Sequence, residues 1–186
     1  MDTSILKLKR KNYIEIGELY FWTATINQWQ RLLWKGDYKN VIINSLKYLV
    51  EKGKIDVFAF VIMPNHIHFI WRIHEMNGKE AVQGSFLKYS AHEFKKLLKN
   101  DTDNNLSNYA VEARNKKYEF WQRDPLAIQL FTRDVAYQKL DYIHANPCTE
   151  YWKLATDPCM YFHSSAKFYM EGIKNFSFLK DLRDEF

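Results

Sequence analysis

The stretch VIMPNHIHFIW, residues 61–71, decides the fold of this chain. On both sides of the Pro64-Asn65 pair the residues are mainly β-branched, aromatic or aliphatic, which predicts strands at residues 55–63 and 66–73. Proline followed by asparagine is a turn signal, and so short a turn can join the two strands only as an antiparallel hairpin. The middle of the chain is therefore predicted to form a β-hairpin.

The second strand of this hairpin carries two histidines on one face. Residues two apart on a strand point the same way, so His66 and His68 project together. The opposite face carries only apolar side chains, Ile67, Phe69 and Trp71, which predicts burial against helices. Two imidazoles at this spacing can share one metal ion, although a bare HxH pair also fits two half-exposed strand histidines.

The flanking sequence predicts a further strand and two helices. Residues 19–26, LYFWTATI, are rich in aromatic and β-branched side chains and predict a strand. Apolar residues recur at helical spacing over residues 40–52, where Gly53 supplies a stop. The same spacing predicts a helix over residues 86–99, followed by a polar surface loop at residues 100–108.

A third helix carries the other residues suited to catalysis, in LDYIHANP at residues 140–147. It should begin near Thr132, which can cap it, and end near Asn146, because a residue before proline avoids helical geometry. Tyr142 and Asn146 are four apart and share a face, which fits a nucleophile beside a metal ligand but also an ordinary helix end. His144 lies off that face and is expected to pack. The order of elements predicts an α+β sandwich with an antiparallel sheet covered on one face.

Composition narrows the class of protein. At 186 residues the chain fits one domain, residues 1–186. A net charge of +5, a pI near 9.0 and 17% aromatic residues favour an anionic partner such as nucleic acid. The longest apolar run, residues 57–63, is too short to span a membrane, and Cys148 and Cys159 form no zinc-like pair. A cytoplasmic protein with no membrane partner is expected.

Taken together, the two motifs resemble one family. The HIH of a hydrophobic strand, followed later by YIHANP, is similar to the single-tyrosine HUH transposases, in particular to the REP-associated tyrosine transposases. Further matching segments, in the expected order, are SFLKYSAHEFKK from Ser85, FWQRDP from Phe120 and DPCMYFHSSAKFY from Asp157. The resemblance covers residues 11–169, whereas residues 170–186 match nothing and are assigned no role.

The resemblance implies a fold and a site. His66 and His68 correspond to the HUH pair, with Ile67 as its hydrophobic middle residue. Tyr142 corresponds to the nucleophile, and Asn146 to the position that completes the site of a metal ion, Mg²⁺ or Mn²⁺. The family fold is a ferredoxin-like sandwich whose central antiparallel sheet carries the HUH pair on a middle strand, in agreement with the hairpin predicted above.

The implied activity is cleavage of single-stranded DNA next to hairpins, which forms a 5′-phosphotyrosine and frees a 3′-hydroxyl. A divalent ion suits this chemistry because it neutralises charge on a nonbridging phosphate oxygen. A free tyrosine has a pKa of about 10, so the metal and the substrate must activate the attacking group. The implied partner is single-stranded DNA with hairpin structure, bound by a monomer or a homodimer.

DNA contacts are expected from basic and aromatic side chains. Lysines can track phosphates, and exposed aromatic rings can stack on unpaired bases. The candidates are Trp121, Gln122 and Arg123, which match a family segment, with Lys88, Lys95, the Lys116-Lys117 pair and the basic residues 7–11.

Two other functions remain open at this stage. A catalytically silent DNA-hairpin-binding protein would keep the fold, although it would have no reason to retain both histidines together with Tyr142 and Asn146. A hydrolytic metal-dependent nuclease would use Tyr142 only structurally. It would release free 5′-phosphate ends and form no protein–DNA adduct.

The chain is predicted to bind single-stranded DNA with a hairpin more tightly than blunt duplex of equal length, with an affinity that falls steeply as salt rises. The physical reasons are the charge of +5 and the 17% aromatic content. Gel shifts across a salt series measure both effects. Equal or tighter binding to plain duplex contradicts this expectation.

Overall fold

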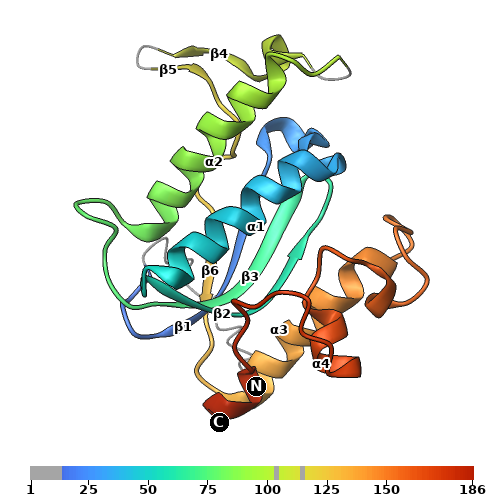
Figure 1. Cartoon of the computed structure of the whole chain (residues 1–186). Helices are drawn as coiled ribbons and strands as arrows, with labels where there is room; N and C mark the ends of the chain where they lie inside the picture. The colour runs from blue at the N-terminus through green and yellow to red at the C-terminus, as the bar shows by residue number, and fades with distance from the viewer. Residues whose placement is uncertain (1–13, 103–104, 114–115) are drawn as a thin grey trace, which may run out of the picture.

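The computed structural model describes residues 14–102, 105–113 and 116–186, and its centre is a four-stranded sheet (Figure 1). The strand order is β2-β3-β1-β6, and every pairing is antiparallel, so the predicted α+β class is confirmed. The strands are β1 (Leu19–Thr25), β2 (Ile55–Ile62), β3 (His66–Ile73) and β6 (Leu126–Gln129), with a separate two-stranded sheet of β4 (Ala110–Ala113) and β5 (Lys116–Tyr118).

The three predicted helices are present, and two of them begin about one turn earlier than the sequence indicated. The third begins as predicted, after Thr132, whose side chain accepts a hydrogen bond from the Val135 amide. The α-helices are α1 (Gly36–Glu51), α2 (Val82–Leu98), α3 (Arg133–Ala145) and α4 (Ala166–Glu171). Short 3-10 helices lie at Asn27–Trp29, Leu32–Trp34, Leu106–Tyr109, Asn146–Cys148, Pro158–Met160 and Leu182–Glu185.

The hairpin of β2 and β3 has the predicted position and direction. The Met63 amide donates to the His66 carbonyl across the turn at 2.8 Å, and Ile62 pairs with Ile67. Because β1 pairs with the other edge of β3, the strand that carries the HxH motif lies inside the sheet. His68 is thereby held between Thr23 of β1 and Val61 of β2.

Helices cover both faces of the sheet, so the prediction of a sheet covered on one face was wrong. α1 and α2 lie over the face that carries Trp22, Phe69 and Trp71, and α3 lies over the other face (Figure 1). The second hydrophobic cluster joins Leu140 and Ile143 of α3 to the sheet. The reason is visible in β2, where every residue is buried; an apolar run of this kind needs cover from both sides.

The C-terminal segment, residues 172–186, covers the Val57 end of the outer edge of β2, and residues 163–165 pair with the rest of that edge. Leu179 forms a parallel bridge with Val57, and the Lys180 amide donates to the Val57 carbonyl at 2.8 Å. Leu182 is fully buried in the cluster beneath α3. An open edge strand can pair with another chain, so this segment protects the sheet, a role that the sequence had not revealed. None of the described helices combines the length and the apolar character needed to cross a membrane.

The Leu182→Ala substitution is predicted to lower the free energy of unfolding by about 2 kcal/mol or more, because it leaves a cavity beneath α3. Urea unfolding followed by circular dichroism measures this loss. The matched control is Ile173→Ala, since Ile173 is a large exposed residue of the same segment and should unfold like wild type. Equal stability of the two variants would show that the segment does not depend on this anchor.

Candidate functional site

A cleft of about 460 Å³ opens between α3 and the face of the sheet that α3 covers. Both predicted histidines and the predicted tyrosine line it, although they come from elements far apart in the sequence. The lining residues are Phe21, Thr23 and Thr25 of β1, Trp29, His66 and His68 of β3, Leu126 and Ile128 of β6, and Lys139 and Tyr142 of α3.

The histidine pair forms the floor of the cleft. The ring centroids of His66 and His68 are 4.7 Å apart, with an interplanar angle of 69°. The alternation of β3 puts both rings on the α3 side, and the sheet register puts Thr25 and Thr23 beside them. Both histidines are buried, so they are not the half-exposed strand residues of the simpler interpretation.

Hydrogen bonds at Nδ1 fix the orientation of each imidazole. His66 Nδ1 lies 2.7 Å from the Asn65 side-chain oxygen, and the Asn65 amide group donates to the Trp29 carbonyl. Since that oxygen can only accept, His66 donates from Nδ1, which leaves the lone pair on Nε2. His68 Nδ1 lies 2.7 Å from Thr23 Oγ1. Partners of this kind set the tautomer of metal-binding histidines.

His68 Nε2 is the atom that points to a ligand. It is buried and makes no hydrogen bond to any residue that the structure describes. Buried polar atoms are nearly always satisfied, so a group from outside the chain is the natural partner. When His68 donates from Nδ1 to Thr23, Nε2 presents a lone pair, which a metal ion would satisfy.

The environment keeps both imidazoles neutral. Burial lowers the pKa of His66 to about 4. Burial also lowers the pKa of His68 well below its usual value, with smaller contributions from the nearby His66 and Lys139. Neutral imidazole is the form that binds metals, so the protein presents the pair ready for coordination near neutral pH.

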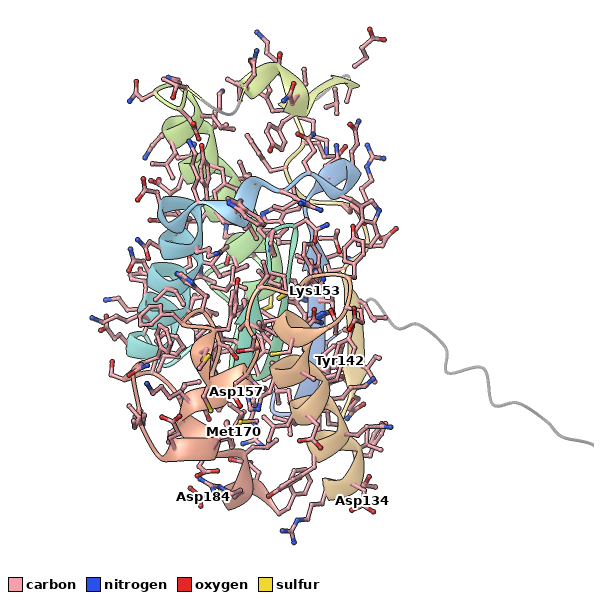
Figure 2. The ribbon with its side chains drawn as sticks, turned by 90° about the vertical axis from the view of Figure 1, so that its right-hand side faces the viewer. Asp134, Tyr142, Lys153, Asp157, Met170 and Asp184 are labelled. Carbon is pink, nitrogen blue, oxygen red and sulfur yellow. The ribbon has the colours of Figure 1, made fainter. Side chains whose placement is uncertain are left out.

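Tyr142 lies directly against this pair. Its ring centroid is 5.2 Å from that of His68 in an edge-on contact and 6.0 Å from that of Phe21. Lys139, one turn earlier on α3, places its Nζ 5.8 Å from the Tyr142 ring and 5.1 Å from the Phe21 ring. Tyr142 is half exposed, and in Figure 2 it lies in the last turn of α3 beside β1, at the other end of the helix from Asp134. A phenol therefore borders both the histidines and solvent.

Asn146 is buried at the end of α3 and does not line the cleft. The sequence placed the end of the helix correctly, but Asn146 keeps helical geometry, with φ −53° and ψ −46°, despite the proline that follows. Its carbonyl accepts from Thr149 Oγ1 at 3.0 Å. Within the described ranges no three His, Cys, Asp or Glu residues gather as a metal site. The assignment of Asn146 as the third ligand stays a prediction.

The predicted DNA contacts lie outside the cleft. Trp121 is buried and donates from Nε1 to Ser90 Oγ at 3.0 Å, so its ring cannot stack on a base; the sequence did not reveal that it is a core residue. Gln122 is half-buried and Arg123 is exposed beside Glu119. Of the lysines, Lys88 pairs with Glu80 and Lys116 pairs with Glu119. The Lys95 Nζ lies 5.1 Å from the centre of the Tyr118 ring, and Lys117 is exposed. Residues 7–11 lie outside the described residues.

Sequence reasoning missed the aromatic residues beside the histidines. Trp29 is exposed and lines the cleft, and the Trp152 ring is 5.8 Å from that of His66. The Arg31 guanidinium lies 5.6 Å from the Trp152 ring and 6.0 Å from that of Trp34. The run WQRLLW at residues 29–34 was the available signal. Lys139 could have been found because it lies three residues before Tyr142 on one helix face.

The fold and the cleft define an α+β protein with an HxH pair on an inner strand and a helix-borne tyrosine facing it. The chain shares this fold with the solved structure of a REP-associated tyrosine transposase bound to a REP hairpin. The two have a TM-score of 0.60 and 16% identity, and the similarity covers 92% of this chain and 91% of that one. No family model and no curated protein sequence matches the chain.

Thr23→Val is predicted to weaken Mn²⁺ binding by roughly tenfold while leaving the fold intact, because it removes the partner of His68 Nδ1 and keeps the shape of the side chain. Titration calorimetry measures the affinity. Thr25→Val is the matched control, since Thr25 lines the same cleft from the same strand and holds neither histidine ring. Unchanged affinity in Thr23→Val would oppose a metal at His68.

Proposed function

We propose that this chain is a tyrosine transposase of the REP-associated type, a metal-dependent enzyme that cleaves and rejoins single-stranded DNA next to hairpins. The observation that carries the proposal is the contact of Tyr142 with His68, whose Nε2 is buried without a partner among the described residues. This contact supplies a nucleophile and a candidate metal ligand within one cleft. The fold shared with a transposase bound to a REP hairpin supports the choice of substrate.

His66 and His68 would hold the metal ion through Nε2, and Asn146 would complete the site. When bound, Mg²⁺ or Mn²⁺ neutralises charge on a nonbridging oxygen of the scissile phosphate. The neutral imidazoles and their fixed Nδ1 partners fit this role. Imidazole ligands also suit Zn²⁺ and Ni²⁺, so calorimetric titration with each of these ions is needed to identify the metal.

Tyr142 would attack the phosphorus through its phenolic oxygen. The new bond is P–O(Tyr142), and the bond that breaks is P–O3′, so the products are a 5′-phosphotyrosine and a 3′-hydroxyl. The phenol gives its proton to solvent, which reaches this half-exposed side chain, and the leaving 3′-oxygen takes one up. Lys139, whose Nζ lies 5.8 Å from the centre of the Tyr142 ring, would offset negative charge that develops in the cleft during attack. Because the linkage energy is kept in the phosphotyrosine, rejoining needs no further energy source.

The surface beside the cleft suits a single strand. Trp29 and Trp34 are exposed, and Arg31 supplies a positive charge between Trp34 and Trp152. Exposed indole rings stack on unpaired bases of any sequence, and a guanidinium can bind the phosphates between them. A strand that leaves a hairpin would thus have both a stacking surface and an electrostatic contact close to His66.

Two rival functions make different predictions for the products. A hydrolytic nuclease would use water as the nucleophile and release free 5′-phosphate ends. A silent hairpin-binding protein would bind the same DNA and leave it uncut. The tyrosine enzyme alone forms a covalent protein–DNA adduct, so the search for that adduct decides among the three.

Tyr142→Phe is predicted to abolish cleavage and adduct formation while metal and DNA affinities stay close to wild type. The substitution removes the attacking oxygen and keeps the ring that contacts His68. A 3′-labelled hairpin oligonucleotide reveals shortened strands and protein-linked DNA, and mass spectrometry maps the adduct. Tyr151→Phe is the control, because Tyr151 is exposed and lies outside the cleft lining. Cleavage at the wild-type rate by Tyr142→Phe would favour the hydrolytic nuclease.

Strand cleavage is predicted to require a divalent ion and to be lost in His66→Ala and His68→Ala, since one imidazole alone leaves too few ligands. Hairpin binding by gel shift and the circular dichroism spectrum should change little. His74→Ala is the control, because His74 directly follows the other end of β3 and pairs with Asp56 outside the cleft. Full cleavage in excess EDTA would refute the metal requirement.

A further inference from the structure

A second pocket lies on the opposite side of the sheet from the histidine cleft. It has a volume of about 360 Å³ and occupies the groove between α1 and α2. Phe86 of α2 forms part of its wall, and the Phe86 ring packs against Phe69 and Trp71, the residues of β3 that face away from His66 and His68. The two pockets are therefore separated by the sheet, and the groove is not part of the proposed catalytic cleft.

The groove contains an unsatisfied hydroxyl. Ser45 of α1 lines the groove, and only 5% of this residue is exposed. Its Oγ has no hydrogen-bond partner in the part of the chain that the structure describes. A helical serine normally donates to a carbonyl one turn earlier, as Ser90 of α2 does to Phe86 at 2.9 Å. An unpaired buried hydroxyl is costly, so a polar atom of a ligand is the partner that would compensate.

The other lining residues indicate the chemistry of that ligand. Tyr48 and Tyr89 are half-exposed aromatic residues on the two helices, and the groove is lined mainly by apolar surface. The Asn44 and Asn77 amides add hydrogen-bonding groups, and Asn77 is tied by its amide to Ser85 at 3.0 Å. No charged side chain is among the described residues that line the groove, and the Lys52 Nζ lies outside this lining, 5.7 Å from the Tyr48 ring. The absence of acidic or imidazole ligands in this lining argues against a metal ion. The groove suits a neutral planar ring with a polar edge.

We propose that this groove binds one nucleobase. The two tyrosines would hold the ring, while Ser45 and the asparagine amides would pair with its polar edge. The choice of a nucleobase among planar rings rests on the proposed function, in which the protein handles single-stranded DNA. An unpaired base of the bound strand and a free nucleoside offer the same chemistry, and the experiments below distinguish the two sources.

Titration of the full-length protein with adenosine and with thymidine tests the pocket directly. At least one nucleoside should bind, and Tyr89→Ala should weaken it by about tenfold, the cost expected for one stacked base. Ser45→Ala should also weaken it by about tenfold, because one hydrogen bond to the base is lost. Tyr151→Ala, an exposed tyrosine outside the groove, should bind like wild type. The melting temperature of Ser45→Ala should be equal or higher, since no hydrogen bond is lost. A purely structural serine would lower it.

A fluorescent hairpin oligonucleotide with an unpaired tail identifies the source of the base. If Tyr89→Ala weakens binding of this oligonucleotide but not of one with an abasic tail, the groove takes a base of the DNA strand. If it weakens only the nucleosides, the groove takes a free nucleoside. Unchanged binding of all ligands in both groove variants would overturn the proposal. Failure of the Tyr142 adduct would refute the catalytic function without affecting the nucleoside titration, so the two failures are distinguishable.

Discussion

The alternation of side chains along β3, an inner strand, controls both the core and the site. Odd-numbered positions carry Ile67, Phe69 and Trp71, which pack beneath α1 and α2, whereas His66 and His68 face α3. An inner strand has neighbours on both edges, so its side chains cannot turn away from their assigned face. The register of β3 therefore fixes the facing direction of the two histidines together with that of the core residues that alternate along the strand. A shift of one residue in the register of β3 would turn the histidines toward α1 and α2 and the apolar residues toward α3, which would disrupt both the core and the site.

The two buried histidines need hydrogen-bond partners for their ring nitrogens, and the surrounding residues supply only some of them. Asn65 and Thr23 satisfy the two Nδ1 atoms and fix the ring orientations, while Nε2 of His68 has no partner among the described residues. Burial of an unpaired nitrogen costs free energy, and a purely structural histidine pair would gain nothing in return. Desolvation also keeps the rings uncharged, since it lowers the pKa of both. The fixed ring orientations and the neutral charge state therefore both fit the proposed binding of a metal ion.

The position of Tyr142 follows from the packing of α3 and not from local sequence. Leu140 and Ile143 anchor the helix on the sheet, and this leaves Tyr142 at the margin of the contact, against His68 on one side and solvent on the other. Lys139 reaches the same cleft from one turn earlier. The same sheet also supports the α1–α2 groove on its other side, so β3 underlies two pockets of different chemistry, one with imidazoles and one with neutral polar groups.

The sequence by itself determined the local features: the hairpin at Pro64-Asn65, the three helices and the shared face of His66 and His68, because turn residues and side-chain periodicity act over short distances. The tertiary structure decided what long-range contacts control. It put α3 on the second face of the sheet, buried Trp121 against Ser90, closed the β2 edge with residues 163–165 and 172–186, and brought Tyr142 against His68. The short strand β6 could not be recognised because LAIQ is stabilised by its pairing with β1. Periodicity shows that a residue is turned toward a face, but only packing between distant segments determines what covers that face.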